Sequence, residues 1–151
     1  MMDSNSKMYI NWPNVEESID YLKFKMEISY WIPDIIVGIA NGGVVPATLL
    51  SKKFKIPVRT VIVQLRDGDI QERNSDIEQY IKDGKRVLLV DDINDTGSTL
   101  QHIKNNWDID DSCWGNNLRT AVIHERIGSK FETDFQSDII KTNEWVVYPW
   151  E

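Results

Sequence analysis

Two stretches of the chain are almost continuously apolar, residues 34–40 and 87–90. Short apolar runs bounded by turn residues are typical of strands that are buried on both faces of a parallel sheet. Weaker patterns predict further strands at residues 58–64, 118–124 and 145–148, and a short extended piece at residues 9–12.

Between these strands, apolar residues recur at helical spacing. They predict a helix over residues 15–30, which Pro33 ends, and Asn14 with Glu17 resembles a capping box at its start. Two more helices are predicted over residues 46–54 and 99–107. Because strands and helices alternate, we expect a parallel-sheet α/β domain with one core. A chain of this length accommodates one such domain, residues 1–151.

Residues 65–85 interrupt the pattern. They are polar and charged, with few apolar positions apart from Ile77, Tyr80 and Ile81. A stretch of this length between two strands of a compact domain is either functional or disordered. The pattern leaves both interpretations open.

Composition narrows the class of protein. The formal net charge is −7, which argues against a nucleic-acid-binding surface because phosphate contacts need clustered Lys and Arg. No stretch is as long as a membrane span, and the first residues lack the apolar core of a signal peptide. Cys113, the only cysteine, fits a reducing compartment. We therefore expect a cytoplasmic protein with no membrane partner.

The same residues limit the choice of metal. Cys113 stands with only two histidines, His102 and His124, so a Cys/His zinc site is not expected. Any metal should be a hard cation held by carboxylates and phosphates, which indicates Mg²⁺.

The strand at residues 87–90 leads into the most informative segment. Asp91 and Asp92 stand at its carboxyl end, where open α/β sheets bind their ligands. The polar turn Asp-Thr-Gly-Ser-Thr, residues 95–99, then offers a glycine for close backbone approach and helix-start N–H groups for an anion. Acids beside a phosphate cradle indicate a site for a phosphorylated sugar. A solvated acidic turn before an N-capped helix explains each residue singly but not their order.

This order resembles the 5-phosphoribosyl-1-diphosphate (PRPP) signature of type I phosphoribosyltransferases: an apolar strand, two acids, two variable residues, then Asp-Thr-Gly-x-Thr. The resemblance implies a single-domain parallel-sheet fold with a small hood. It also implies that Asp91 and Asp92 bind the PRPP ribose and Mg²⁺, and that Asp95 is the catalytic general acid/base. The residues implied for the 5′-phosphate are Asp95, Thr96, Gly97, Ser98 and Thr99.

A second loop, Ala40-Asn41-Gly42-Gly43, follows the first central strand. Gly-Gly before a helix is often only a tight turn, but two glycines also let a loop wrap a diphosphate. With the signature, it resembles the pyrophosphate loop of xanthine-guanine and hypoxanthine-guanine phosphoribosyltransferases, which implies a cis peptide bond at Ala40–Asn41. Asn41 stands where that family often has Arg or Lys, so Arg66 and Arg73 are the implied cations. They would belong to a hood loop that closes over PRPP; a solvated loop is the alternative.

The C-terminal residues resemble the base-binding segment of the xanthine-guanine enzymes, through Trp145-Val146 and Pro149-Trp150-Glu151. The resemblance implies that Trp145 stacks on the base, with Val146 beside it. Arg126 is the implied contact to the exocyclic oxygen, and Lys130 is the other candidate. The alternative for Trp145 is a core aromatic.

The implied reaction transfers the phosphoribosyl group of PRPP to a 6-oxopurine (guanine, hypoxanthine or xanthine) and releases pyrophosphate, as in purine salvage. Three alternatives remain: a PRPP-binding regulatory or non-catalytic module, an enzyme with another acceptor, and a scaffold with a decayed site. Asp95 and the negative charge argue against a nucleic-acid-binding regulator. Gln64-Leu65-Arg66 replaces the family's usual Ser-Tyr, which keeps the last alternative open. Family members are usually dimers or tetramers, so we expect a homo-oligomer.

Overall fold

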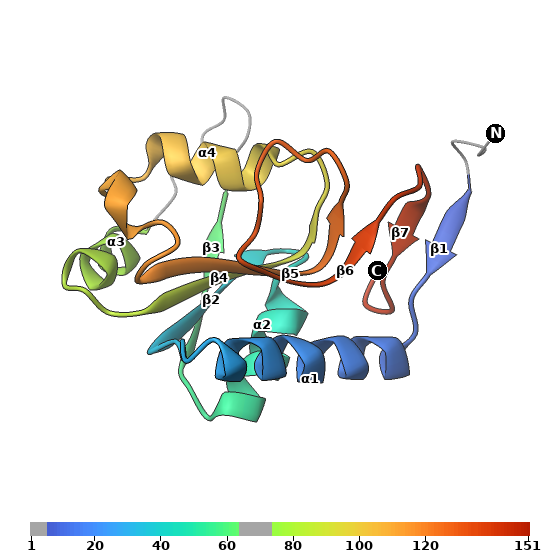
Figure 1. Ribbon diagram of the computed structural model, residues 1–151, viewed down its shortest axis with the longest axis horizontal. Coiled ribbons are helices and arrows are strands. Elements are labelled where there is room, and N and C mark those ends of the chain that lie inside the picture. Colours follow the sequence, from blue (N-terminus) through green and yellow to red (C-terminus); the bar gives the residue numbers. More distant parts are fainter. Residues whose placement is uncertain (1–5, 64–73) are drawn as a thin grey trace.

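A five-stranded parallel sheet forms the centre of the molecule, with strand order β3-β2-β4-β5-β6 (Figure 1). The computed structural model describes residues 6–63 and 74–151. Every neighbouring pair in this sheet is parallel, as the sequence pattern predicts. Because parallel strands end at the same edge, the loops that follow them meet there. The strands are β2 (Ile35–Ala40), β3 (Val58–Ile62), β4 (Val87–Asn94), β5 (Leu118–Arg126) and β6 (Phe135–Ile140).

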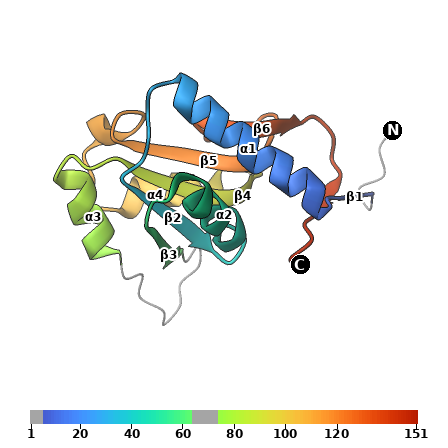
Figure 2. The same ribbon diagram turned by 90° about the horizontal axis from the view of Figure 1, so that it is seen from below.

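Helices cover both faces of the sheet (Figures 1 and 2). On one face lie α1 (Trp12–Ile28) and α2 (Val44–Phe54), and on the other lie α3 (Ser75–Lys82) and α4 (Ser98–Asn106). Within the described ranges, no helix combines the length and apolarity needed to cross a membrane. The layers are those of the predicted α/β fold.

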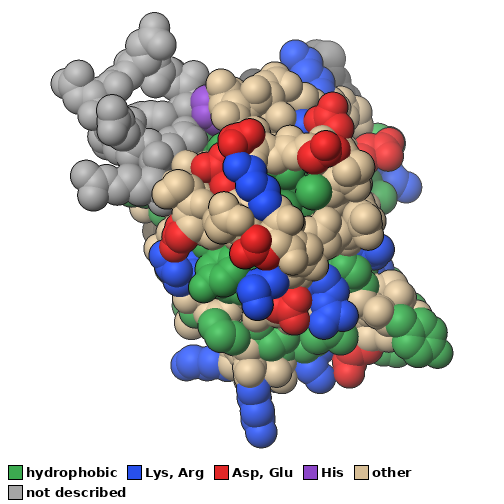
Figure 3. Space-filling view, turned by 90° about the vertical axis from the view of Figure 1, so that its left-hand side faces the viewer, with side chains coloured by type: hydrophobic (Ala, Val, Ile, Leu, Met, Phe, Trp, Pro, Cys, Tyr) green, Lys and Arg blue, Asp and Glu red, His purple; other side chains and the backbone are tan. Residues whose placement is uncertain are grey.

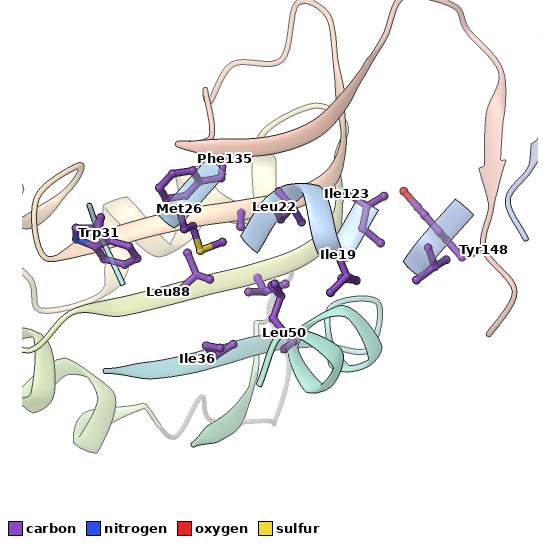
Figure 4. Packing of buried hydrophobic residues seen from close by; sticks show 14 of the residues in the cluster. Ile19, Leu22, Met26, Trp31, Ile36, Leu50, Leu88, Ile123, Phe135 and Tyr148 are labelled. Carbon is purple, nitrogen blue, oxygen red and sulfur yellow. The ribbon is translucent and has the colours of Figure 1, made fainter. Parts of the chain in front are cut away.

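Side chains of the central strands alternate between two apolar cores. On β2, Ile36 packs with α1 and α2, whereas Val37 packs with α3 and α4. On β4, Leu88 and Leu89 divide in the same way. Figure 4 shows the first core, with Met26 of α1 beside Leu88. Burial on both faces explains why these strands are continuously apolar in sequence.

α1 begins earlier than predicted. The Asn11 side chain accepts a hydrogen bond from the Asn14 N–H (2.8 Å), and the Asn14 side chain accepts one from the Asn11 N–H (3.2 Å). The predicted capping box from Asn14 to Glu17 is therefore wrong, and Trp12 is helical rather than extended. α1 also ends short of residue 30, because Tyr30 has a φ of 57°, outside the helical region.

Three other elements differ from the predictions. α3 occupies part of the polar segment 65–85, where Ile77 and Ile81 are buried in the second core. No strand is predicted where β6 lies, because its sequence, Phe-Gln-Ser-Asp-Ile-Ile, lacks regular alternation. β4 continues to Asn94, so the acidic pair lies inside the strand rather than after it. A 3₁₀ turn, Asp111–Cys113, lies in the acidic turn before β5.

A second, two-stranded parallel sheet joins segments from the two ends of the chain (Figure 1). We call it the small sheet; it consists of β1 (Lys7–Tyr9) and β7 (Trp145–Val147). The Trp145 N–H donates to the Ser6 carbonyl (2.9 Å), and the Ile10 N–H donates to the Val147 carbonyl (2.9 Å). The small sheet therefore fixes the backbone on both sides of the residue predicted to stack on a base.

Charged side chains of both signs are interspersed on the face that Figure 3 shows. The described ion pairs include Arg86 with Asp34 (3.2 Å) and Lys53 with Asp20 (3.1 Å). Together with the net charge of −7, this pattern is unlike the clustered basic surface that nucleic-acid binding requires.

Candidate active site

The loop after β4 encloses a small cavity. Residues 91–100 line a volume of about 210 Å³ between the end of β4 and the start of α4. Gly97 caps α4 with a φ of 90°, a left-handed conformation that glycine adopts without strain. The hydroxyl oxygens of Thr96 and Ser98 lie 2.8 Å apart. Backbone N–H groups at a helix start, next to two hydroxyls, suit an anion such as a phosphate.

Residues 129–131 hold this loop from outside. The Lys130 N–H donates to the Thr96 carbonyl (3.0 Å). A β-carbon at Gly97 would lie 2.6 Å from the Phe131 nitrogen and 2.8 Å from Ser129 Oγ, so only glycine fits there. Lys130 thus contacts the loop through its backbone, while the residue is exposed.

Asp91 and Asp92 form a closely coupled pair of carboxylates. Burial raises the pKa of Asp91 well above its ordinary value, and the neighbouring charge of Asp92 raises it further. Burial also raises the pKa of Asp92, although hydrogen bonds from Asp91 and the Ile93 N–H oppose the shift. The Asp92 N–H donates to Asp91 Oδ1 (2.9 Å). A cation beside this pair would stabilise both negative charges.

The loop after β2 packs against the same pair. A β-carbon at Gly42 would lie 2.7 Å from Oδ1 of Asp92, and one at Gly43 would meet the carbonyl oxygen of Val90. Both positions therefore need glycine, because the loop after β2 touches β4 there. The peptide bond between Ala40 and Asn41 is cis, as the resemblance predicts.

The groups predicted to bind pyrophosphate fall into two sets. The backbone of residues 40–43 lies beside the acidic pair, with the Asn41 side chain exposed. Arg66 and Arg73 lie outside the described residues. The described part of the site therefore unites the glycine loop with the two carboxylates.

Arg126, the last residue of β5, joins Asp95 to the segment before β7. Its Nε donates to Asp95 Oδ1 (2.5 Å), Nη1 donates to the Thr142 carbonyl, and Nη2 donates to the Glu144 carbonyl (2.9 Å). A guanidinium carries five N–H donors, so two remain beyond these three bonds. The predicted base contact and the predicted general acid/base are thus direct neighbours.

Trp145 follows Glu144 and is 61% exposed, so it is not a core aromatic. Val146, the next residue, is buried and packs in the first core with Tyr148. The Tyr148 hydroxyl donates to the carbonyl of Asp92 (3.1 Å). The segment that carries Trp145 is therefore connected to Asp95 at one end, through Arg126, and to Asp92 at the other, through Tyr148.

Two side chains that join these parts are not found by sequence reasoning, Glu125 and Tyr148. Glu125 is buried, and its Oε1 accepts from the Asn94 amide (2.9 Å) and the Thr133 N–H (2.8 Å). A charged residue directly after a predicted apolar strand is the one signal that could have identified Glu125. Tyr148 gives no local signal, since its partner is 56 residues away.

Comparisons with known proteins identify the family. The family of the phosphoribosyl transferase domain matches residues 6–151. The xanthine-guanine phosphoribosyltransferase of Cereibacter sphaeroides is 26% identical over 121 residues, which cover 77% of this chain and 68% of that protein.

Solved structures extend the likeness to the fold. A purine phosphoribosyltransferase from Pyrococcus horikoshii is 26% identical with a TM-score of 0.73, and the alignment covers 97% of this chain and 94% of that one. The xanthine-guanine-hypoxanthine phosphoribosyltransferase of Helicobacter pylori, 18% identical, shares the fold with a TM-score of 0.71 over 96% and 93% of the two chains. With the family match covering nearly the whole sequence, the chain belongs to the phosphoribosyltransferase family, and the protein is an enzyme of that family.

Proposed function

We propose that this enzyme transfers the phosphoribosyl group of PRPP to a ring nitrogen of a 6-oxopurine base and releases pyrophosphate, a reaction of purine salvage. The main support is that side-chain hydrogen bonds connect residues 142–148, which include Trp145, to Asp95 and to Asp92. Arg126 joins this segment to Asp95, and Tyr148 joins it to Asp92. The printed names of two relatives, a xanthine-guanine enzyme and a purine enzyme, favour the same class of acceptor.

PRPP would bind along the edge where β2 and β4 end. The backbone N–H groups and hydroxyls of residues 96–99 would hold the 5′-phosphate, helped by the dipole of α4. Asp91 and Asp92 would accept hydrogen bonds from the ribose hydroxyls. Residues 40–43 would bind the pyrophosphate with backbone groups, together with Arg66 and Arg73.

The donor set at the acidic pair fits Mg²⁺. The two carboxylates offer oxygen ligands. Burial raises the pKa of both, the charge of Asp92 raises that of Asp91 further, and a bound cation would oppose these shifts. Among the described residues, no group of three or more His, Cys, Asp or Glu side chains forms a complete metal site. Mg²⁺ characteristically takes one or two carboxylates and completes its shell with substrate phosphates and water. When bound, it would neutralise the charge of the leaving pyrophosphate.

Asp95 would act as the general base. In the transfer, the bond between the anomeric carbon and the pyrophosphate oxygen breaks, and pyrophosphate leaves with the electron pair. A bond from the purine nitrogen to that carbon forms through an oxocarbenium-like transition state. The proton lost by the purine nitrogen would pass to the Asp95 carboxylate, which accepts a hydrogen bond from Arg126 Nε and is held in place by it.

The base would stack on the exposed indole of Trp145, beside Val146. Arg126 has two N–H donors left after its contacts with Asp95, Thr142 and Glu144, and these suit an exocyclic oxygen such as that of a 6-oxopurine. The amino group of adenine is itself a hydrogen-bond donor, so placing it against the N–H donors of Arg126 would be unfavourable.

Titration calorimetry with PRPP tests the binding half of this proposal. We expect heat of binding with Mg²⁺ and a large loss of affinity in the double variant Asp91→Asn, Asp92→Asn, whose amides are poor ligands for Mg²⁺. Absence of PRPP binding by the wild-type protein would count for a decayed site. Binding without turnover on any base would favour the non-catalytic module.

Assembly and location complete the proposal. We expect a homodimer or tetramer in the cytoplasm. The outer side of α1 exposes Tyr21, Phe24 and Ile28, which favours self-association, and the single free Cys113 suits a reducing compartment. Light scattering coupled to size-exclusion chromatography measures the molar mass in solution, and the mass of a monomer would contradict the proposed assembly.

A further inference from the structure

The small sheet is hydrogen-bonded separately from the five-stranded sheet, so side chains must fix one relative to the other. Arg126 reaches the Glu144 carbonyl, directly before Trp145. Tyr148, directly after β7, reaches the Asp92 carbonyl within β4. Trp145 thus lies between two side-chain connections, and only the first belongs to a residue with a role in the proposed chemistry.

The direction of the Tyr148 hydrogen bonds follows from its partners. A backbone carbonyl can only accept, so the hydroxyl donates its single proton to the Asp92 oxygen (3.1 Å). The hydroxyl oxygen therefore accepts from His124 Nδ1 (2.7 Å), and the neutral imidazole carries its proton on Nδ1. Three elements, β5, β4 and the segment after β7, are thereby joined through one hydroxyl.

Packing leaves this hydroxyl little freedom. Tyr148 is 2% exposed, and its ring stacks on Trp150 with centroids 4.9 Å apart and planes 7° apart. Trp150 in turn contacts Trp12 at the start of α1, with ring centroids 5.9 Å apart. A ring held in this way fixes the position of its hydroxyl, so the contact with Asp92 has one geometry.

We propose that Tyr148 is a positioning residue. Its hydroxyl holds β7, which carries Trp145, at a fixed place relative to Asp92, so that the base is bound at the correct distance and orientation from the ribose of PRPP. This inference rests on the proposed function. Asp92 keeps its own place through the pairing of β4 with β2 and β5, whereas β7 pairs with β1 alone in the described residues. Loss of the hydroxyl should therefore affect the base more than PRPP.

The test is Tyr148→Phe, which keeps the stacked ring and removes only the hydroxyl. We expect the KM for the purine base to rise about two- to tenfold, the range set by one buried hydrogen bond, while the KM for PRPP stays nearly unchanged. Tyr30→Phe, which removes a hydroxyl from an almost fully exposed ring, is the matched control and should change neither constant. An unchanged base KM, or equal rises in both constants, overturns the proposal.

Variants of His124 cover the case in which Tyr148→Phe does not fold. His124→Leu removes the donor to the hydroxyl, and we expect a smaller rise in base KM. His124→Asn keeps an N–H near the position of Nδ1 and should restore the wild-type value. If His124→Leu leaves the base KM unchanged, the proposal fails. A wild-type protein that turns over no purine overturns the proposed function itself, whereas normal wild-type turnover with unaffected variants overturns only the role of Tyr148.

Discussion

Gly42 lies directly against the carboxylate of Asp92, since a β-carbon on Gly42 would be 2.7 Å from Oδ1 and closer still to Oδ2. Gly42 follows β2, whereas Asp92 lies within β4, and these two strands are neighbours in the sheet. Their contact joins the glycine loop and the acidic pair into one surface at the carboxyl edge. A diphosphate and a ribose linked through one carbon could therefore be held together there.

Replacement of Gly42 tests this contact. In Gly42→Ala the added methyl group must displace the Asp92 carboxylate, and we expect kcat/KM for PRPP to fall about a hundredfold. Gly84→Ala is a control of similar chemistry, because Gly84 has a φ of 83° and no neighbour within 4 Å of an added β-carbon. The control should lose about 1–2 kcal/mol of stability and keep its kinetics. Equal kinetics in both variants would contradict the proposed site.

Asp95→Asn separates binding from chemistry. Asparagine can still accept a hydrogen bond from Arg126 but cannot take a proton from the purine nitrogen. We expect kcat to fall about 10²–10⁴-fold, the usual contribution of a general base, with nearly unchanged affinity for PRPP by calorimetry. Unchanged turnover would remove Asp95 from the mechanism.

Arg126→Lys tests the fork that joins Asp95 to the Thr142 and Glu144 carbonyls. A lysine ammonium presents its donors from one point and cannot reproduce three divergent bonds. We expect the KM for the base to rise about tenfold with little change for PRPP, measured by initial rates. Arg119→Lys, at a side chain that stacks on Trp31, is the control and should keep both constants. A base KM equal to that of the wild type would contradict the base-side role of Arg126.

His124 predicts a pH dependence of stability. Burial lowers the pKa of His124 below 6.5 in the folded protein. The charge of Asp138 opposes this shift and the charge of Arg126 adds to it. Glu17 of α1 lines a surface cavity together with His124 and Asp138. The unfolded chain therefore binds more protons, so this contribution to stability is present above pH 6.5 and is lost as the pH falls toward the folded pKa. His124→Asn should lose less unfolding free energy than the wild type between about pH 7.5 and pH 5.5, measured with urea. Parallel losses in the two proteins would contradict a depressed pKa.

Local patterns predicted the acidic loop because its chemistry lies in consecutive residues. Asp91 lies near the end of the buried strand β4, Asp95 and Gly97 come directly after it, and all three line one cavity. Tyr148 and Glu125 could not be predicted in this way. Their partners come from other strands, so their burial and bonding depend on the packed sheet rather than on neighbours in sequence.

The secondary structure was likewise predictable only where the local sequence pattern determines it. The central strands were predictable because burial on both faces makes them continuously apolar. β6 is an edge strand in which polar Asp138 and apolar Ile139 are both exposed, so its apolar pattern is too irregular to distinguish it from a loop. The start of α1 was misplaced because Asn11 and Asn14 are both good caps, and only the backbone geometry decides between them.

The most direct measurement is a steady-state assay of the purified protein with PRPP, Mg²⁺ and guanine, hypoxanthine, xanthine or adenine in turn. Formation of the nucleoside 5′-monophosphate and pyrophosphate from at least one 6-oxopurine, with adenine a poor acceptor, is the result that the account predicts. Silence with all three 6-oxopurines, while PRPP still binds, would contradict it and indicate another acceptor or a non-catalytic role.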